Sequence, residues 1–329
     1  MILSRTPFRV SFFGGGSDLP SWFRKNTGEV LSTTIDKYCY ITARFLPPFF
    51  ANKFRIVYSK IEEVNSIDSI NHPVVKAFLN EYAVNKGVEI HHFSDLPARS
   101  GIGSSSSFTV GLINSLSALY QENISKLELA NKAIHIEQDI LKENVGCQDQ
   151  IAVSFGGLNN IYFEKNGSYI VNQIKIADDR RNDFENNLLL FFTGITRFSS
   201  NIQEKQIKNI KINKSKLTAM QSMVQDGINI LSNKKHSLDD FGYLLNESWK
   251  IKESLADGIS NQTIHNFYSE ILNEGALGGK LLGAGGGGFM IFYVNPRRQK
   301  TVIETAKAMG MLHIPFKFEN SGSKIIYND

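Results

Sequence analysis

A turn rich in glycine and serine carries the clearest chemical signal in the sequence. Residues 97–107 contain glycines at positions 101 and 103 and four consecutive serines, and they lead directly into a segment with the apolar spacing of a helix. Glycine allows tight turns that present backbone N–H groups without hindrance, and the amino terminus of a helix favours an anion. The segment therefore predicts a loop that wraps phosphates. The alternative is a flexible Gly/Ser linker, but a linker would not run straight into an apolar-faced helix.

Glu137 and Asp149 are the acidic residues whose surroundings suggest chemistry. A lone glutamate in a helix is usually exposed, and an aspartate after a helix is usually a turn former. Asp149, however, stands between two glutamines, shortly after Gly146 and just before the apolar residues 151–153. This position indicates a carboxylate held at the edge of a core, where it could act on a bound ligand.

Two further glycine runs could approach a ligand. The first, residues 14–16, is flanked by Arg5, Arg9 and Asp18. Alternation along a strand predicts that the two arginines share one face and a pocket with an acid, although charges on an exposed strand edge are the simpler alternative. The second run, residues 283–288, fits Gly-x-Gly-x-x-Gly but precedes a strand rather than a helix, which excludes a dinucleotide-binding fold. Such dense glycine predicts a backbone that closely approaches another chain segment or a ligand.

The elements that must position these residues begin as strands. Alternating apolar residues predict strands around residues 8–12, 30–34, 38–45 and 54–58. Helical spacing predicts helices over residues 71–82, after the serines, and from Ser125 to about Glu143, where Ser125 and Glu128 have the spacing of a capping box.

A polar stretch over residues 176–187 separates the two halves of the chain, and we expect a domain boundary there. In the second half we predict a strand over 188–193, helices over 199–232, 237–255 and 263–274, a strand over 289–294, a helix near 297–309 and a strand near 316. Strands mixed with helices, without regular alternation, predict an α+β protein.

The bulk properties exclude several classes of protein. A composition of 42% hydrophobic and 21% charged residues is not that of a disordered or fibrous chain. The net charge of +4 is too small to predict binding to nucleic acid. Cys39 and Cys147 cannot form a disulfide framework, and their number favours a reducing compartment. No apolar run is long enough to cross a membrane, and no secretory signal opens the chain. We therefore expect a cytoplasmic protein without nucleic-acid or membrane partners.

Taken in order, the motifs resemble the GHMP kinase superfamily. They are Arg5-x-Pro7-x-Arg9 leading into residues 14–18, Pro97-x-x-x-Gly-Ile-Gly-Ser-Ser-Ser, Asp149-Gln150, and Lys280-Leu-Leu-Gly-Ala-Gly-Gly-Gly-Gly. Within the superfamily, Gly-x-Gln-Asp-Gln followed by residues 155–159 most resembles the kinases of D-glycero-D-manno-heptose 7-phosphate. Those enzymes phosphorylate the anomeric hydroxyl in nucleotide-heptose synthesis for surface polysaccharides.

The resemblance implies a two-domain α+β fold, residues 1–184 and 185–329, with ATP, Mg2+ and a sugar in the cleft between the domains. It implies that Asp149 accepts the proton of the sugar hydroxyl beside Arg9, and that Ser105 and Glu137 hold Mg2+. The residues that would bind the ATP phosphates are Arg99, Ser100, Gly101, Ile102, Gly103, Ser104, Ser105 and Ser106. The candidate substrate contacts are Gly15, Gly16, Ser17, Asp18, Gly156, Gly157, Arg197, Gly285 and Gly286.

The substrate remains open between a heptose phosphate and another sugar or small alcohol, such as a galactose-like, fucose or mevalonate-like compound. Galactokinases carry Glu-His where this chain has Gly15-Gly16, so contacts made by those side chains do not carry over. A third alternative is a non-catalytic sensor of nucleotide or sugar. The joint presence of Ser105, Glu137 and Asp149 favours an enzyme, because binding alone does not need a base. The expected partners are ATP and a sugar or sugar phosphate, in a monomer or a homodimer.

Overall fold

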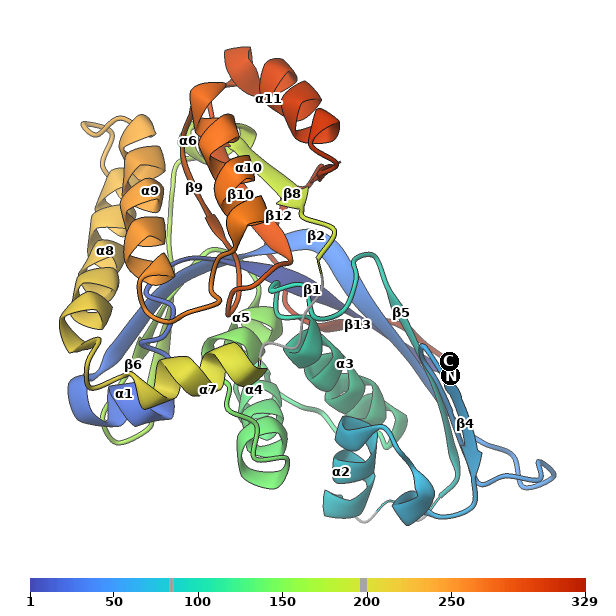
Figure 1. Ribbon diagram of the computed structural model, residues 1–329. Coiled ribbons are helices and arrows are strands. Elements are labelled where there is room, and N and C mark those ends of the chain that lie inside the picture. Colours follow the sequence, from blue (N-terminus) through green and yellow to red (C-terminus); the bar gives the residue numbers. More distant parts are fainter. Residues whose placement is uncertain (83, 85, 196–199) are drawn as a thin grey trace.

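The computed structural model describes residues 1–82, 84, 86–195 and 200–329, which form two sheets flanked by helices (Figure 1). The nine-stranded sheet has the order β13-β1-β2-β5-β3-β4, with β12 and β6 also paired to β2, and β7 paired to β6. The four-stranded sheet has the order β11-β8-β10-β9. The prediction of an α+β fold is confirmed.

The strands of the large sheet are β1 (Ile2–Phe13), β2 (Gly28–Phe45), β3 (Phe54–Val57), β4 (Ile61–Val64), β5 (Val88–Ser94), β6 (Asn159–Phe163), β7 (Tyr169–Gln173), β12 (Phe318–Glu319) and β13 (Lys324–Asn328). Those of the small sheet are β8 (Leu188–Phe192), β9 (Ala276–Leu281), β10 (Phe289–Val294) and β11 (Leu312–Ile314).

Helices of the first half pack on the large sheet. α3 (Ser104–Leu119) and α5 (Gln148–Phe155) both contact β2 and also β1, which carries the start of the opening motif. α2 (Pro73–Glu81) and α4 (Lys126–Ile134) pack beside α3. α1 (Pro20–Asn26) connects β1 to β2. This arrangement brings the amino termini of α3 and α5 to the strand that contains Arg9.

Helices of the second half pack on the small sheet. α9 (Asp239–Glu253) and α10 (Gln262–Asn273) contact β9, and α11 (Pro296–Ala308) contacts α10 and β11. α8 (Lys214–Ser232) packs on α9 and also on β1 and β2, so it joins the two halves. Two shorter helices, α6 (Asp178–Asn186) and α7 (Ser200–Lys208), complete this half.

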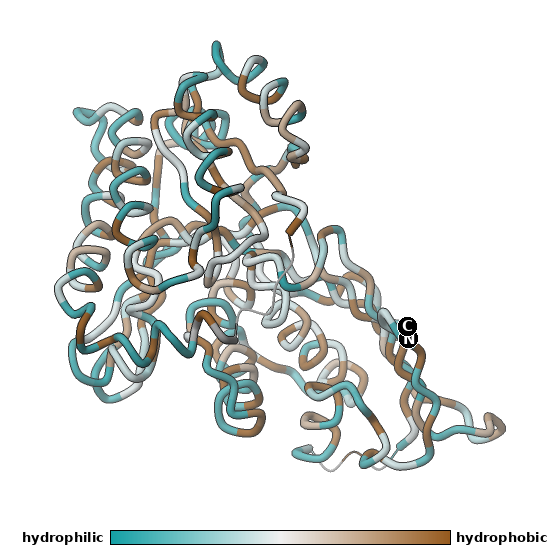
Figure 2. The backbone as a smooth tube through the Cα atoms, in the orientation of Figure 1, coloured by the Kyte–Doolittle hydropathy of each residue, from teal (hydrophilic) through white to brown (hydrophobic). Residues whose placement is uncertain are grey.

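Burial explains the sequence patterns of these elements. Every residue of β10 is buried, which accounts for its unbroken apolar run. In Figure 2 the tubes of α8 and α9 instead change between hydrophobic and hydrophilic colours along their length, as expected of helices buried on one side. The core continues between the halves: the Phe12 ring lies 5.7 Å from Phe184 and 5.3 Å from Phe241.

The strands differ from the prediction in the opening segment. Residues 30–34 and 38–45 belong to one long strand, β2, and the pairing of β1 with β2 shifts register between Pro7 and Phe8. Before this irregularity Ser4 faces α3 and donates to Gly111, whereas beyond it Arg9 faces the helices. The expectation that Arg5 and Arg9 share a pocket is therefore wrong. A register irregularity of this kind re-aims the side chains on either side of it.

Two helical features near the motifs also differ. The capping box at Ser125 and Glu128 is confirmed, but α4 ends at Ile134 and the chain continues as a π-helical turn, His135–Ile140, which contains Glu137. π-helical turns are rare in proteins, and those that occur are often found at functional sites. The Gln-Asp-Gln segment, for which no helix was predicted, forms the first turn of α5.

The carboxyl end of the chain returns to the large sheet. The predicted boundary after residue 184 falls within α6, between β7 of the large sheet and β8 of the small one. β12 and β13, however, return to pair with β2 and β1. None of the helices described is long and apolar enough to cross a membrane.

Candidate active site

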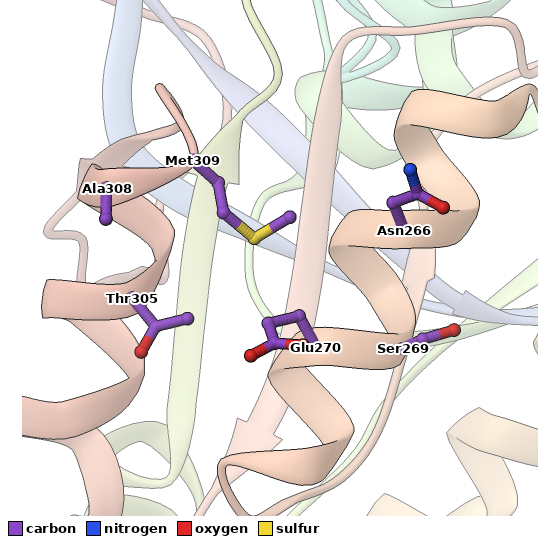
Figure 3. Close-up of a pocket in the computed structure, with 6 residues that line it drawn as sticks. All are labelled: Asn266, Ser269, Glu270, Thr305, Ala308 and Met309. Carbon is purple, nitrogen blue, oxygen red and sulfur yellow. The ribbon is translucent and has the colours of Figure 1, made fainter.

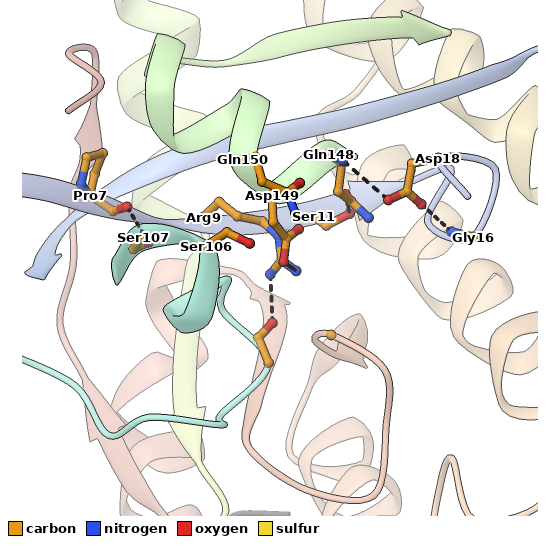
Figure 4. Close-up of polar contacts among 12 residues, drawn as sticks. Pro7, Arg9, Ser11, Gly16, Asp18, Ser106, Ser107, Gln148, Asp149 and Gln150 are labelled. Carbon is orange, nitrogen blue, oxygen red and sulfur yellow. Dashed lines mark hydrogen bonds and ion pairs between the residues drawn. The ribbon is translucent and has the colours of Figure 1, made fainter. Parts of the chain in front are cut away.

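The centre of the candidate site is an ion pair between Arg9 of β1 and Asp149 of α5 (Figure 4). Arg9 Nε lies 2.7 Å from Asp149 Oδ1, and Arg9 Nη2 lies 2.7 Å from Oδ2. The arginine side chain is almost fully buried, while 24% of the Asp149 side chain is exposed. The bidentate contact fixes the orientation of the carboxylate, and the exposed fraction leaves it within reach of a ligand.

The predicted phosphate loop lies directly against this pair. Arg9 Nη1 donates to the Gly101 carbonyl at 2.7 Å, and the Arg9 backbone N–H donates to that of Ile102 at 3.0 Å. Gly103 begins α3 with a φ of +74°, and a Cβ at this residue would lie 3.5 Å from Asp149 Oδ2. The amino terminus of α3, where backbone N–H groups favour an anion, is thus adjacent to the carboxylate.

Hydroxyl groups of the loop hold its own conformation. Ser104 Oγ accepts a hydrogen bond from the Arg99 backbone N–H at 3.0 Å. Ser100 Oγ donates to the Pro97 carbonyl at 2.6 Å, and Ser100 is fully buried. The Ser100 hydroxyl is thus committed within the loop, whereas the Ser104 hydroxyl, which accepts here, keeps its own proton to donate.

The second glycine run packs against the back of the phosphate loop. A Cβ on Gly283 would lie 2.4 Å from Gly101 Cα, and one on Gly288 would lie 2.2 Å from the Ser100 carbonyl oxygen. The Phe289 backbone N–H donates to the same oxygen at 3.0 Å. These glycines are needed because two backbones meet, as the density of glycine predicted.

Glu137 approaches the first turn of α3 and is 1% exposed. Its Oε2 accepts hydrogen bonds from Ser106 Oγ, at 3.0 Å, and from the Gln150 amide, whereas its Oε1 has no partner among the described residues. Burial raises the pKa of Glu137 to about 7. Ser105, in the same turn, is exposed.

This arrangement fits a magnesium ion. A buried carboxylate oxygen without a partner, next to serine hydroxyls, is the kind of hard donor that Mg2+ prefers. The described residues contain no group of three or more His, Cys, Asp or Glu that could hold a metal. An ion held by Glu137 would therefore take its other oxygens from serine, nucleotide and water.

In Figure 4, Asp18 lies on the other side of Asp149 from Ser106. Asp18 is 3% exposed. The Gly16 backbone N–H donates to its Oδ1 at 2.9 Å, and the Gln148 backbone N–H donates to Oδ2 at 3.4 Å. Burial and then the charge of Asp149 raise the pKa of Asp18 above its usual value. A Cβ on Gly146 would lie 1.8 Å from Asp18 Oδ2, so glycine there makes room for the carboxylate.

Two family models and several known kinases match this chain. Residues 69–157 match the model of the GHMP kinases N terminal domain, and residues 230–310 match that of the GHMP kinases C terminal. A D-glycero-alpha-D-manno-heptose 7-phosphate kinase of Campylobacter jejuni is 32% identical over 340 residues, covering 98% of each chain. The chain belongs to the GHMP kinase family.

Solved structures support the fold of this GHMP kinase. A structure described as D-glycero-D-manno-heptose 1-phosphate kinase from Bacteriodes thetaiotaomicron superposes with a TM-score of 0.81 at 23% identity, covering 100% of both chains. A putative sugar kinase from Campylobacter jejuni gives a TM-score of 0.71 at 26% identity, covering 98% of this chain and 97% of the other. The predicted enzyme class, an ATP-dependent sugar kinase, is confirmed by these relatives.

The residues predicted to contact substrate around the first glycine run are placed differently in this GHMP kinase. Gly15 and Gly16 lie beside Gln148 and Asp18, within the site. Ser17 is instead 1% exposed, and its hydroxyl donates to the backbone carbonyls of Gly14 in the loop and Glu29 in β2. A substrate contact by the Ser17 hydroxyl is therefore not supported, because the group is committed to folding the loop.

Four other predicted contacts lie elsewhere or turn toward protein. Gly156 and Gly157 follow the carboxyl end of α5, roughly 12 Å along the helix from its first turn, and they pack on residues 319–322. A role in binding substrate beside Asp149 is not supported for them. Gly285 and Gly286 pack on Ile259, where the Gly286 N–H donates to its carbonyl at 2.8 Å. Arg197 lies outside the described residues.

Four residues of the site were missed by the sequence reasoning. Ser11 Oγ donates to Gln148 Oε1 at 2.8 Å, which orients an amide next to Asp149. Lys252 and Lys280 are buried behind the phosphate loop. Gln148 and Lys280 stand inside recognised motifs and could have been found by their position. Ser11 and Lys252 carry no comparable signal, because only the fold brings them to the site.

A surface hollow of about 530 Å3 lies between α10 and α11, away from this site (Figure 3). Its lining residues are Asn266, Ser269, Glu270, Thr305, Ala308 and Met309. Glu270 is the one ionisable side chain among these lining residues, so the hollow lacks the paired groups that phosphoryl transfer requires.

Proposed function

We propose that this GHMP kinase transfers the γ-phosphoryl group of ATP to the anomeric hydroxyl of D-glycero-D-manno-heptose 7-phosphate, giving the 1,7-bisphosphate. The observation that carries the proposal is the Asp149 carboxylate, fixed by Arg9 and adjacent to the amino terminus of α3. In this proposal the carboxylate is the acceptor for a hydroxyl proton, and the helix terminus beside it binds phosphate. The choice of sugar rests on the 7-phosphate kinase that is 32% identical.

In this proposal Asp149 positions the sugar hydroxyl and takes its proton. Each carboxylate oxygen accepts one hydrogen bond from Arg9 and keeps a second lone pair for the substrate. The sugar oxygen forms a bond to the γ-phosphorus as the bond to the bridging oxygen of ADP breaks, and the hydroxyl proton passes to Asp149. Such transfer depends mainly on positioning and on neutralising charge.

The phosphates of ATP would lie at the amino terminus of α3, against the backbone of residues 101–106. Glu137 and Ser105 would hold Mg2+, with Ser106 and Gln150 orienting the carboxylate of Glu137. When bound, the ion would offset part of the negative charge of the phosphates.

On the sugar side, Asp18 and Gln148 are the groups proposed to bind hydroxyls. Asp18 is held by two backbone N–H groups and can accept a further bond. The Gln148 amide, whose oxygen accepts from Ser11, presents its nitrogen as a donor. We place this reaction in the cytoplasm, with ATP and a sugar phosphate as partners.

A panel of acceptors tests the proposal. The kinase is assayed by ADP release with heptose 7-phosphate, unphosphorylated heptose, heptose 1-phosphate, galactose, fucose and mevalonate. We expect kcat/KM for the 7-phosphate to exceed the others by at least about 100-fold, since a site built for a group rejects analogues that lack it. Equal efficiency with unphosphorylated heptose, or turnover of the 1-phosphate alone, would contradict it.

A further inference from the structure

Two lysines lie buried behind the active site, and the mechanism above does not use them. Lys252, from α9, is 7% exposed, and Lys280, from β9, is 2% exposed. Lys252 Nζ donates to the carbonyls of Leu281, at 2.7 Å, and Gly283, at 2.6 Å. Lys280 Nζ donates to the Phe12 carbonyl at 2.6 Å. Among the described carboxylates, none forms an ion pair with either lysine.

Both lysines contact backbone carbonyls rather than carboxylates, and a third cation, Arg9, lies near them. Burying an ammonium group without a counter-charge is costly, and carbonyl oxygens supply only partial negative charge. Arg9, the third cation, commits its guanidinium to Asp149 and Gly101. Burial and the nearby charge of Arg9 lower the pKa of Lys280 to about 7, and burial together with Lys280 lowers that of Lys252 well below its usual value.

Each lysine is connected to the phosphate loop through one intermediate segment of backbone. Lys252 holds the carbonyl of Gly283, whose backbone abuts Gly101 of the loop. Gly101 in turn accepts from Arg9, and Lys280 holds the strand that carries Arg9 through the Phe12 carbonyl. A phosphate at the amino terminus of α3 would therefore have the backbones of Gly101 and Gly283 between it and Lys252, while Lys280 contacts the strand that carries Arg9.

We propose that Lys252 and Lys280 form a buried cationic seat for the nucleotide phosphates, and that this seat takes up a proton from solvent when ATP binds. In the protein without ATP, Lys252 and Lys280 are not both protonated. The phosphates bring the missing negative charge, which favours the fully protonated pair. The proton moves from solvent to a lysine Nζ. This inference rests on the proposed function, because it requires ATP phosphates at α3.

Calorimetry measures the proton directly. ATP is titrated into the protein at pH 8 and saturating magnesium in two buffers of different ionisation enthalpy, without sugar. At this pH the nucleotide phosphates are already ionised, so any uptake belongs to the protein. We expect uptake approaching one proton, and an affinity that falls by up to about tenfold per pH unit above neutrality, as linkage requires. Binding without proton uptake overturns the inference, whereas absence of ATP binding contradicts the proposed function as well.

Variants separate charge from packing. Lys280→Arg keeps a charge that does not titrate, so it should retain most of the affinity for ATP and take up less of the proton, with Lys252 as the remaining titrating lysine. Lys280→Met and Lys252→Met should each lower both. Lys250→Met, at an exposed position of the same helix, is the matched control and should behave as the unmodified protein. Uptake that persists undiminished in the folded Lys280→Arg and Lys252→Met proteins would overturn the assignment.

Discussion

At the scale of single residues, the orientation of one carboxylate governs the proposed chemistry. Arg9 lies on β1, where that strand pairs with β2, and contacts both oxygens of Asp149, so the acceptor is held on a rigid support. A positioned base contributes roughly 100- to 10,000-fold to a rate. Small changes at Asp149 should therefore affect turnover far more than binding.

Asp149→Asn should lower kcat by about 100- to 10,000-fold while the Kd for ATP changes little, because the amide cannot accept the hydroxyl proton. Single-turnover kinetics and nucleotide titration measure the two quantities. Asp139→Asn, on an exposed side chain, serves as the control and should have normal kinetics. Near-normal chemistry in the Asp149 variant would show that another group accepts the proton.

Glu137→Gln and Ser105→Ala should each raise the magnesium concentration needed for half-maximal activity. Both remove a hard oxygen donor, and water can replace part of it. Ser106→Ala should have a smaller effect, because that hydroxyl already donates to Glu137. Since burial raises the pKa of Glu137 to about 7, the magnesium requirement should also grow as the pH falls below 7. Unchanged titrations in both first variants would refute the proposed coordination.

At the scale of elements, the loop that contains Gly101 packs directly against the loop that contains Gly283, a contact we call the seam. Gly101 and Gly283 approach so closely that a single methyl group would collide with backbone. Such a contact cannot be relieved by a side-chain rotation, so the loops must separate or the fold must strain.

Gly283→Ala should therefore reduce both stability and activity, because the loop that presents ATP phosphates would be displaced. Gly258→Ala is the matched control: its φ of +88° is also positive, but a Cβ there has nothing within 4 Å. The backbone penalty is thus common to both variants and the collision is specific to one. Equal melting temperatures and equal KM values for ATP in the two proteins would contradict the role of the seam.

Local signals in the sequence predicted several elements but not their mutual orientation. The capping box fixed the start of α4 because its hydrogen bonds span only Ser125 and Glu128. α5 escaped prediction because it has eight residues and opens on three polar side chains. The prediction that Arg5 shares a pocket with Arg9 was wrong because of the register irregularity after Pro7. That irregularity depends on pairing with β2, which lies elsewhere in the sequence.

At the scale of the whole molecule, the large sheet collects strands from both ends of the chain. β13 pairs with β1, and β12 pairs with β2, across nearly the full length of the sequence. Pairings so distant leave no local periodicity, so they were not predictable from sequence patterns. The proposed catalytic pair, Arg9 and Asp149, is separated by 140 positions and was reached through motif order rather than through spacing.

Glu89 links the stability of this sheet to pH. Burial alone would raise the pKa of Glu89, but hydrogen bonds from His91, Arg55 and Arg44 outweigh it and lower the pKa to about 2. A carboxyl with a lowered folded pKa stabilises the fold above its unfolded value, near 4.5, and loses this contribution as the pH falls toward 2.

Glu89→Gln should consequently lose stability at neutral pH and show a flatter dependence between pH 5 and pH 2 than the unmodified protein. Denaturant unfolding at a series of pH values measures the difference. Glu122→Gln, on an exposed side chain, is the control and should retain the unmodified slope. Parallel curves for the Glu89 variant and the unmodified protein would contradict this account.

The most direct test of the central claim is the position of the new phosphate. The protein is incubated with ATP, Mg2+ and D-glycero-D-manno-heptose 7-phosphate, and the product is followed by phosphorus NMR. We predict a second sugar phosphorus signal coupled to the single anomeric proton, appearing as ADP forms. ADP accompanied only by inorganic phosphate, or a new phosphate at any carbon other than the anomeric one, would contradict the account.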